Sequence, residues 1–254
     1  MPRAAINERR KMKSEDLDRV LADVILDHAL EFRVGERAFR LYPVTLAKQL
    51  RLQPHVKALC LDYATLRANP YMEALRVAAG KREECCHILA VHTAANTRAA
   101  FHDDAAASLR RELFCDKVDT TDLASLMLHV LSGDHTEALM QHLGLARERE
   151  RLSQVMAVKR KTSKNSLSFG GVSLLGAFIG QLHEMGYSDD EILYERGYSY
   201  LRLRLADKVT SVYVTDDELS QIPTDMGGTF LRGDDPDAAD GLMALLEERG
   251  VKAG

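Results

Sequence analysis

The chain has 254 residues, enough for one or two domains, and its formal net charge is −4. With 46% hydrophobic and 28% charged residues, the composition predicts a packed core, and it excludes both a disordered chain and a uniformly basic nucleic-acid coat protein. Aromatic residues make up only 6%, Trp is absent, and the abundant unbranched side chains favour helix over sheet because they lose little rotamer freedom in a helix.

The N-terminal region predicts one helix followed by a β-hairpin. Ser14 is a good helix N-cap, and the apolar residues that follow recur at the spacing of one helical face until near Ala29. The segments 31–34 and 37–42 then alternate on either side of Gly35-Glu36, which predicts two short strands joined by a two-residue turn. Because an isolated hairpin is marginally stable in water, we expect it to pack on helices.

From residue 45 to about residue 145 the pattern is helical throughout. Thr45 is the expected N-cap of the first helix, and breaks are predicted at Pro54, Asn69-Pro70, Gly80, 93–97, 119–120 and 133–134. The resulting helices are short, and each has one apolar side, so they bury themselves only against one another. The sequence therefore predicts a mainly α fold: a bundle of short amphipathic helices with a small N-terminal β-hairpin, whose first domain spans 1–145.

Residues 146–168 are strongly basic, and we interpret them as a linker or exposed loop. The segment contains seven positively charged residues and two glutamates, which gives a local net charge of +5. The residues that would contact a phosphate backbone are Arg147, Arg151, Lys159, Arg160, Lys161 and Lys164. No aromatic residue lies among them to stack on bases, and an acidic segment at 216–240 can neutralise them internally. We therefore expect no nucleic-acid partner, but a helical nucleic-acid-associated regulator remains the alternative function.

The remainder, 169–254, predicts a C-terminal helical module with an acidic tail. A small-residue helix is expected at 172–185 and a short one at 238–249, and capping boxes open at Ser188 and Thr215. Residues 198–206 fit both helix and strand. The strong cap at Ser188 favours helix there, and any strand is placed at 210–214.

Three motifs with possible chemistry are incomplete. Gly171 and Gly176 have the spacing of a phosphate-binding loop, but Ala177 and Phe178 stand where that loop requires Lys and Ser or Thr. His183-Glu184 lacks the second histidine of a zinc-protease helix, because Tyr187 occupies its position. Neighbouring helical residues such as Cys85 and Cys86 point about 100° apart and rarely bind one ion.

These gaps predict a protein without a catalytic residue, metal or cofactor. Two acid–histidine pairs, at 102–104 and 134–137, fall where helices begin and are interpreted as caps. The four cysteines, at 60, 85, 86 and 115, form no CxxC pair, and no apolar stretch reaches the ~20 residues of a membrane span, which predicts reduced thiols in a cytoplasmic protein. An enzyme would instead require a deep pocket lined by Cys86, His87 and His92, or by His102 and Asp103.

Two parts of the sequence resemble proteins encoded in the tail modules of phages and prophages from gut anaerobes. The first is residues 169–218, and the second is residues 39–46. The matching motifs are Phe169-Gly170-Gly171-Val172-Ser173, Met185-Gly186-Tyr187-Ser188, Tyr194 to Asp207, Lys208-Val209-Thr210-Ser211-Val212-Tyr213 and Phe39-Arg40-Leu41-Tyr42-Pro43-Val44-Thr45-Leu46. The resemblance covers about a third of the chain, and its motifs are structural.

The resemblance implies a non-enzymatic tail assembly chaperone that binds a tape-measure-like helical protein in the host cytoplasm. Such a partner is long and apolar before the tail tube covers it, and a protein that keeps it soluble needs apolar grooves and a charged exterior. The aromatic side chains expected to bind the partner are Phe39, Tyr42, Phe169, Phe178, Tyr187, Tyr194 and Tyr198. An oligomer is compatible with this role, and membrane association is not expected.

Overall fold

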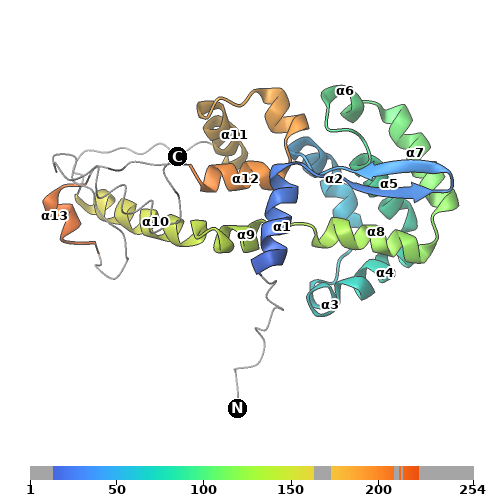
Figure 1. The fold of residues 1–254 in the computed structure, drawn as a ribbon, viewed down its shortest axis with the longest axis horizontal. Helices are drawn as coiled ribbons and strands as arrows, with labels where there is room; N and C mark the ends of the chain where they lie inside the picture. Colours follow the sequence, from blue (N-terminus) through green and yellow to red (C-terminus); the bar gives the residue numbers. More distant parts are fainter. Residues whose placement is uncertain (1–13, 163–172, 209–211, 213, 223–254) are drawn as a thin grey trace, which may run out of the picture. The chain divides into compact units, whose positions relative to one another are not determined.

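The computed structural model describes residues 14–162, 173–208, 212 and 214–222. Within these ranges the chain forms thirteen α-helices, one π-helical turn and one two-stranded antiparallel hairpin near the N-terminus (Figure 1). The mainly α fold with a small N-terminal hairpin is therefore confirmed. The chain divides into two compact units, one of residues 1–149 and 167–210 and the other of residues 150–166 and 211–254.

The first unit contains most of the helices and both strands. Its elements up to residue 92 are α1 (Ser14–Ile25), β1 (Leu30–Val34), β2 (Arg37–Leu41), α2 (Leu46–Ala58), α3 (Tyr63–Ala68), α4 (Pro70–Gly80) and α5 (Arg82–His92). They are followed by α6 (Arg98–Phe101), α7 (Asp104–Lys117), α8 (Thr120–Ser132), α9 (Thr136–His142), α11 (Leu174–Glu184), the π-helical η1 (Glu191–Glu195) and α12 (Tyr198–Ala206).

The hairpin forms as predicted. Val34 pairs with Arg37 around the turn, and Gly35 takes the positive φ of +57° that a tight hairpin turn requires. Phe32 pairs with Phe39 across the strands, and both rings contact Phe114 of α7. The hairpin is thus held by the helical core, since two strands alone do not bury enough surface.

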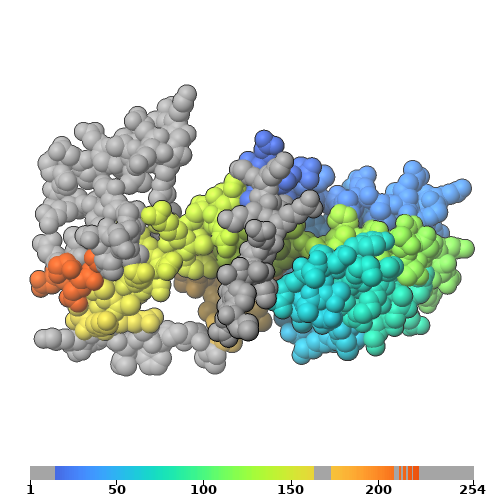
Figure 2. All heavy atoms as spheres, turned by 90° about the horizontal axis from the view of Figure 1, so that it is seen from below, coloured from blue at the N-terminus to red at the C-terminus, as the bar shows by residue number. Residues whose placement is uncertain are grey.

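The main core lies between α2, α4, α5, α7 and α8. Its fully buried members include Leu59, Ile88, Phe114, Leu123 and Met127. In the space-filling view the cyan atoms of α3 and α4 lie next to the green atoms of α8 (Figure 2). The predicted breaks at Asn69-Pro70, Gly80 and 133–134 do separate these helices, and asparagine and aspartate side chains cap several of them.

Two smaller clusters complete the first unit. Leu46 packs with Leu182, Ile192 and Leu201, which joins the start of α2 to α11, η1 and α12. The apolar face of α1 packs against Leu139, Met140 and Leu203 of α9 and α12. Residues 198–206 are therefore helical, as favoured, because both sides of α12 are covered by other helices.

The structure differs from the sequence prediction in four places. Helix α1 ends at Ile25, before Ala29, and α2 continues through Pro54, where a break was predicted. Most of 146–168 is not a linker or loop, because residues 145–162 form α10 (Leu145–Thr162). Charged residues with long unbranched side chains favour helix even without an apolar stripe, and residues 163–168 lie outside the described ranges. Val212 and Val214 are not in a strand.

The second unit contains the latter part of α10 and the short α13 (Asp216–Leu219). The predicted capping box is present: Thr215 N donates to Glu218 Oε2 at 2.9 Å, and Glu218 N donates to Thr215 Oγ1 at 3.3 Å. The predicted helix at 238–249 lies outside the described residues.

Among the helices that the structure describes, none has the length and apolar character needed to cross a bilayer.

Candidate interaction site: an apolar groove beside α2

An apolar groove of about 650 Å³ lies in the first unit between α2, α3, α11 and the start of α12. We call it the α2 groove. Its lining residues are Leu46, Gln49, Leu50, Gln53, Val56, Lys57, Tyr63, Leu174, Leu175, Phe178 and Tyr198. Large apolar side chains here are open to solvent: Leu50 is 46% exposed, Tyr63 64%, Leu174 93% and Leu175 41%. An exposed apolar patch with a polar rim is typical of an interaction surface.

The two faces of α2 explain why its side of the groove is open. Lys48, Leu52, His55 and Leu59 are spaced so that they share one face, which turns toward α5 and the main core. Leu46, Leu50, Gln53 and Lys57 share the spacing of the opposite face. Only Leu46 on this second face is covered, by α11, η1 and α12, so the rest of the face lines the groove.

The buried face of α2 is anchored by Lys48, whose side chain is 1% exposed. Its Nζ donates to Ala94 O at 2.6 Å, to Asn96 Oδ1 at 2.7 Å and to His92 O at 3.4 Å, and so satisfies oxygen acceptors at the C-terminal end of α5 and in the residues that follow it. Burial, with a contribution from the nearby Arg110 charge, lowers the pKa of Lys48 to about 7. These hydrogen bonds fix the rotation of α2 and keep Leu50 on the groove side.

Phe178 of α11 and Tyr198 of α12 form the wall next to Leu46. Their ring centroids are 5.5 Å apart. Helix α11 begins directly at the groove, because Ser173 Oγ accepts a hydrogen bond from Gly176 N at 2.9 Å and caps the helix, which leaves Leu174 and Leu175 in its exposed first turn.

Tyr198 is held in place by contacts between distant parts of the chain. Its backbone N donates to Val44 O at 2.7 Å, and the preceding residue, Gly197, forms an isolated antiparallel bridge with Thr45. Gly197 N also donates to Asp27 Oδ1 at 3.1 Å, and Asp27 has a left-handed φ of +49°. Burial raises the pKa of the Asp27 carboxyl despite this hydrogen bond and the nearby Arg196.

The predicted partner-binding aromatics are not all in one place. Phe178 and Tyr198 line the α2 groove. Phe39 contacts the core through Phe32 and Phe114, and Tyr42 donates its backbone N to His92 O at 3.1 Å. Phe169 lies outside the described residues.

Tyr187 and Tyr194 face other side chains. The Tyr187 hydroxyl lies 3.3 Å from the Tyr200 hydroxyl and accepts a hydrogen bond from Arg204 Nε at 3.3 Å. Tyr194, in η1, contacts the rings of Phe101 and His102 and lies under the Arg98 guanidinium. These contacts lie outside the α2 groove.

Sequence reasoning missed most of the groove. Leu50, Val56 and Tyr63 were not singled out, and neither were Leu174 and Leu175. The available signal was the spacing of Leu46, Leu50 and Lys57 along one helical face. Because the sequence predicts a break at Pro54, Leu46 and Leu50 fall in one predicted helix and Lys57 in the next, and their common face is not recognised.

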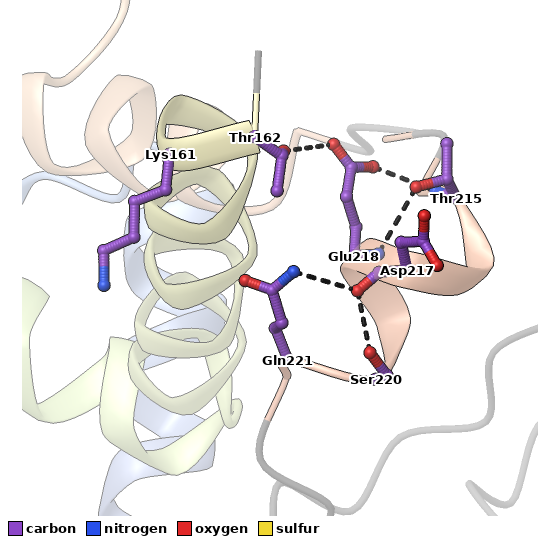
Figure 3. Close-up of a pocket in the computed structure, with 7 residues that line it drawn as sticks. All are labelled: Lys161, Thr162, Thr215, Asp217, Glu218, Ser220 and Gln221. Carbon is purple, nitrogen blue, oxygen red and sulfur yellow. Dashed lines mark hydrogen bonds between the residues drawn. The ribbon is translucent and has the colours of Figure 1, made fainter.

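The basic residues of α10 are partly neutralised within the second unit. Lys159 Nζ lies 3.7 Å from Glu218 Oε2, and Thr162 Oγ1 donates to Glu218 Oε1 at 2.7 Å. Figure 3 shows the recess that Thr162 and Glu218 line, and in it Lys161 extends away from the Glu218 carboxylate. Its polar groups already bond to one another, because Ser220 Oγ and Gln221 Nε2 both donate to Asp217 O. Lys164 lies outside the described residues.

Three members of the cysteine and histidine cluster of α5 are buried, and the fourth, His87, is partly buried. Cys85 and Cys86 are fully buried and His92 is 4% exposed. Burial raises the pKa of both thiols to about 12, with smaller contributions from Glu84 at Cys85 and from Cys115 at Cys86. Because the thiolate is the reactive form, these groups are inert at neutral pH. No three or more His, Cys, Asp and Glu side chains of the described ranges are grouped so that they could hold a metal ion.

The acid–histidine pairs have structural roles. Asp103 Oδ1 accepts from Ala106 N at 2.9 Å and caps α7, and Asp134 Oδ1 accepts from Thr136 N at 3.1 Å at the start of α9. Asp103 is therefore the helix cap expected from the sequence, whereas the N-cap of α9 is His135 and Asp134, the residue before it, accepts the N–H of the first helical residue. No protein-family model, curated protein or solved structure matches the chain.

Proposed function

We propose that the chain is a non-enzymatic assembly factor of a phage-type tail system, which binds an apolar helical segment of a tape-measure-like partner in the α2 groove. The observation that carries this proposal is the groove itself, in which Leu50, Tyr63 and Leu174 expose apolar surface between polar side chains. Helix-in-groove recognition uses this kind of surface, and it requires no reactive group.

The position of the two resembling segments supports the tail-system part of the proposal. Residues 39–46 and residues 169–218 are far apart in sequence, yet Thr45 bridges to Gly197 and Leu46 packs on Leu182 and Leu201. Both segments contribute to the groove, through Leu46 from the first and through Leu174, Phe178 and Tyr198 from the second.

The test is site-specific photo-crosslinking in cells that co-express the full chain with the tape-measure-like protein of the same genome. A photoreactive residue replaces Leu50 in the groove or, as a matched control, Leu109, which is an exposed leucine of α7 at 68% exposure. We expect a crosslink to the partner from position 50 and none from position 109. Equal crosslinking at both positions, or none at either, would contradict the proposal.

A substitution test complements the crosslinking. Leu50→Glu places a charge in the apolar groove and should abolish co-purification of the partner, whereas Leu109→Glu should retain it. Both side chains are already exposed, so both variants are expected to fold, and circular dichroism of the purified proteins checks this.

A further inference from the structure

The length of the α2 groove and the charge at one of its ends define the kind of helix that it accepts. This inference rests on the proposed function. The wall formed by α2 runs from Leu46 to Lys57, a distance of about 16 Å at the helical rise, or about three turns. Leu46 and Leu50 lie along this wall, and Phe178 and Tyr198 stand opposite its first turn. A helix with apolar residues at spacings of three and four residues matches this surface.

Charge distinguishes the two ends of the groove. Among the described lining residues, Lys57 carries the only charge, and Gln49 and Gln53 supply neutral amides along the rim. Lys57 is exposed and makes no ion pair in the part of the chain that the structure describes. A carboxylate is the complement that an unpaired ammonium group selects in an occupant.

A second copy of the chain is poorly suited to fill the groove. The described helix with the most fitting pattern is α1, which has acidic residues in its first turn and an apolar stripe at Leu17, Val20 and Leu21. That stripe already packs against Leu139, Met140 and Leu203 within the same molecule. Because that stripe is covered, α1 of a second copy is not free to fill the groove, and we take the occupant to be a helix of another protein.

We propose that the α2 groove binds an amphipathic helix of about three turns from a partner protein, with a carboxylate at the end of that helix that lies over Lys57. The apolar contacts supply the affinity, and the ion pair selects the direction in which the helix lies. Because the pair is exposed at the rim, its contribution is modest and salt-dependent.

The experiment measures binding of fluorescent helical peptides to the full chain by anisotropy. Three peptides share one leucine stripe over about three turns and differ only at one end, which carries two glutamates, two glutamines or two lysines. The protein is the wild type, Lys57→Glu, or Lys117→Glu. Lys117 is a matched control because it is an exposed lysine in the last turn of α7, as Lys57 is in the last turn of α2.

We expect the wild type and Lys117→Glu to bind the glutamate peptide about threefold to fivefold more tightly than the lysine peptide. Lys57→Glu should reverse that order, and high salt should remove the difference. Equal affinity for all three peptides would overturn the inference about charge while leaving the proposed function intact.

Two other outcomes would also overturn the inference. The first is that no peptide binds although the tape-measure-like partner still crosslinks to position 50, because the groove would then take a segment of another kind. The second is concentration-dependent self-association that Leu50→Glu abolishes and Leu109→Glu does not, since a second copy would then be the occupant. Sedimentation velocity of the wild type, Leu50→Glu and Leu109→Glu measures the second outcome.

Discussion

Gly197 lies where three distant segments of the chain meet, and its lack of a side chain permits that approach. A Cβ at this position would lie 2.8 Å from Asp27 Oδ1 and 3.3 Å from Pro43 Cβ. The Asp27 carboxylate cannot withdraw easily, because it accepts the Gly197 N–H hydrogen bond. The residue that follows is Tyr198 of the groove wall, so this small contact positions a much larger surface.

Gly197→Ala should therefore lower the free energy of unfolding by about 1–3 kcal/mol, as overpacking does elsewhere. Gly180 is the matched control: it lies inside α11, and a Cβ there would meet nothing within 4 Å. Gly180→Ala should raise stability by about 0.5–1 kcal/mol, because alanine is the better helix former. Urea unfolding of both variants measures these changes, and shifts of the same sign would contradict the steric argument.

His92 makes the stability of the first unit sensitive to acid. Burial, with the nearby Lys48 charge, lowers the pKa of His92 to about 3. An unfolded histidine has a pKa of about 6.5, so below that pH the unfolded state binds a proton that the native state excludes. The stabilising contribution of the neutral imidazole is therefore present above about pH 6.5 and is lost as the pH falls.

We expect the free energy of unfolding to fall between pH 7 and pH 5 by at most about 1.4 kcal/mol per pH unit for this group. His92→Gln should flatten this dependence. A smaller slope will remain, because burial also lowers the pKa of His87, with contributions from His55 and Arg51. Exposed His129 is the control, and if His129→Gln reduced the slope as much as His92→Gln, the buried site would not be its source.

At the scale of elements, the hairpin is a structural support. Phe39 stacks on Phe32 at a centroid distance of 5.7 Å and meets the edge of Phe114 at 5.0 Å. These contacts join β1 and β2 to α7. Leu50 of α2, by contrast, is 46% exposed and faces the groove.

Phe39→Ala should lower the free energy of unfolding by about 3 kcal/mol, because it removes an aromatic ring from a packed cluster. The affinity of the remaining folded protein for a groove-binding peptide should not change. Leu50→Ala should show the opposite pattern, with weaker binding and a stability change within about 0.5 kcal/mol. Thermal unfolding and peptide anisotropy, measured on the same samples, separate the two effects. Loss of binding in folded Phe39→Ala would instead place the hairpin in the interaction site.

Elements with local determinants could be predicted from the sequence. Gly35-Glu36 specifies the hairpin turn, and the Ser188 and Thr215 capping boxes form through side chains only three residues away. Helix α2 was divided wrongly because a proline inside a helix is locally unfavourable. In the structure, burial of Leu52 and Leu59 on either side of Pro54 keeps the helix continuous.

The α2 groove could not be predicted in the same way, because its walls come from segments far apart in sequence. Phe178 and Tyr198 were singled out as aromatics, but nothing local indicates that they meet Leu46. Helix α10 was missed for a different reason. Its apolar residues are few and only Val155 is buried, so the periodic signal that identifies amphipathic helices is weak.

At the scale of the whole molecule, the two units differ in chemistry. The first contains the apolar groove, and the second contains a recess in which charged and polar groups bond to one another. Glu218 is the centre of that recess. Hydrogen bonds from Thr215 N and the Thr162 hydroxyl, together with the Lys159 charge, lower the pKa of the Glu218 carboxyl. It therefore stays ionised at neutral pH and offsets the positive charge of α10.

This internal pairing, with the net charge of −4, predicts no retention on double-stranded DNA even at a salt concentration of about 50 mM, where phosphate contacts are strongest. The measurement is an electrophoretic mobility shift of labelled DNA with the full chain. Glu218→Gln removes the negative charge that offsets α10, and the same mobility-shift measurement on this variant tests whether α10 then retains DNA. The prediction would be contradicted if the wild type retained DNA, if salt weakened that retention, and if changing Lys159, Arg160 and Lys161 together to Gln abolished it. That result would favour a nucleic-acid-associated regulator, because each lysine or arginine bound to a phosphate adds to the salt dependence.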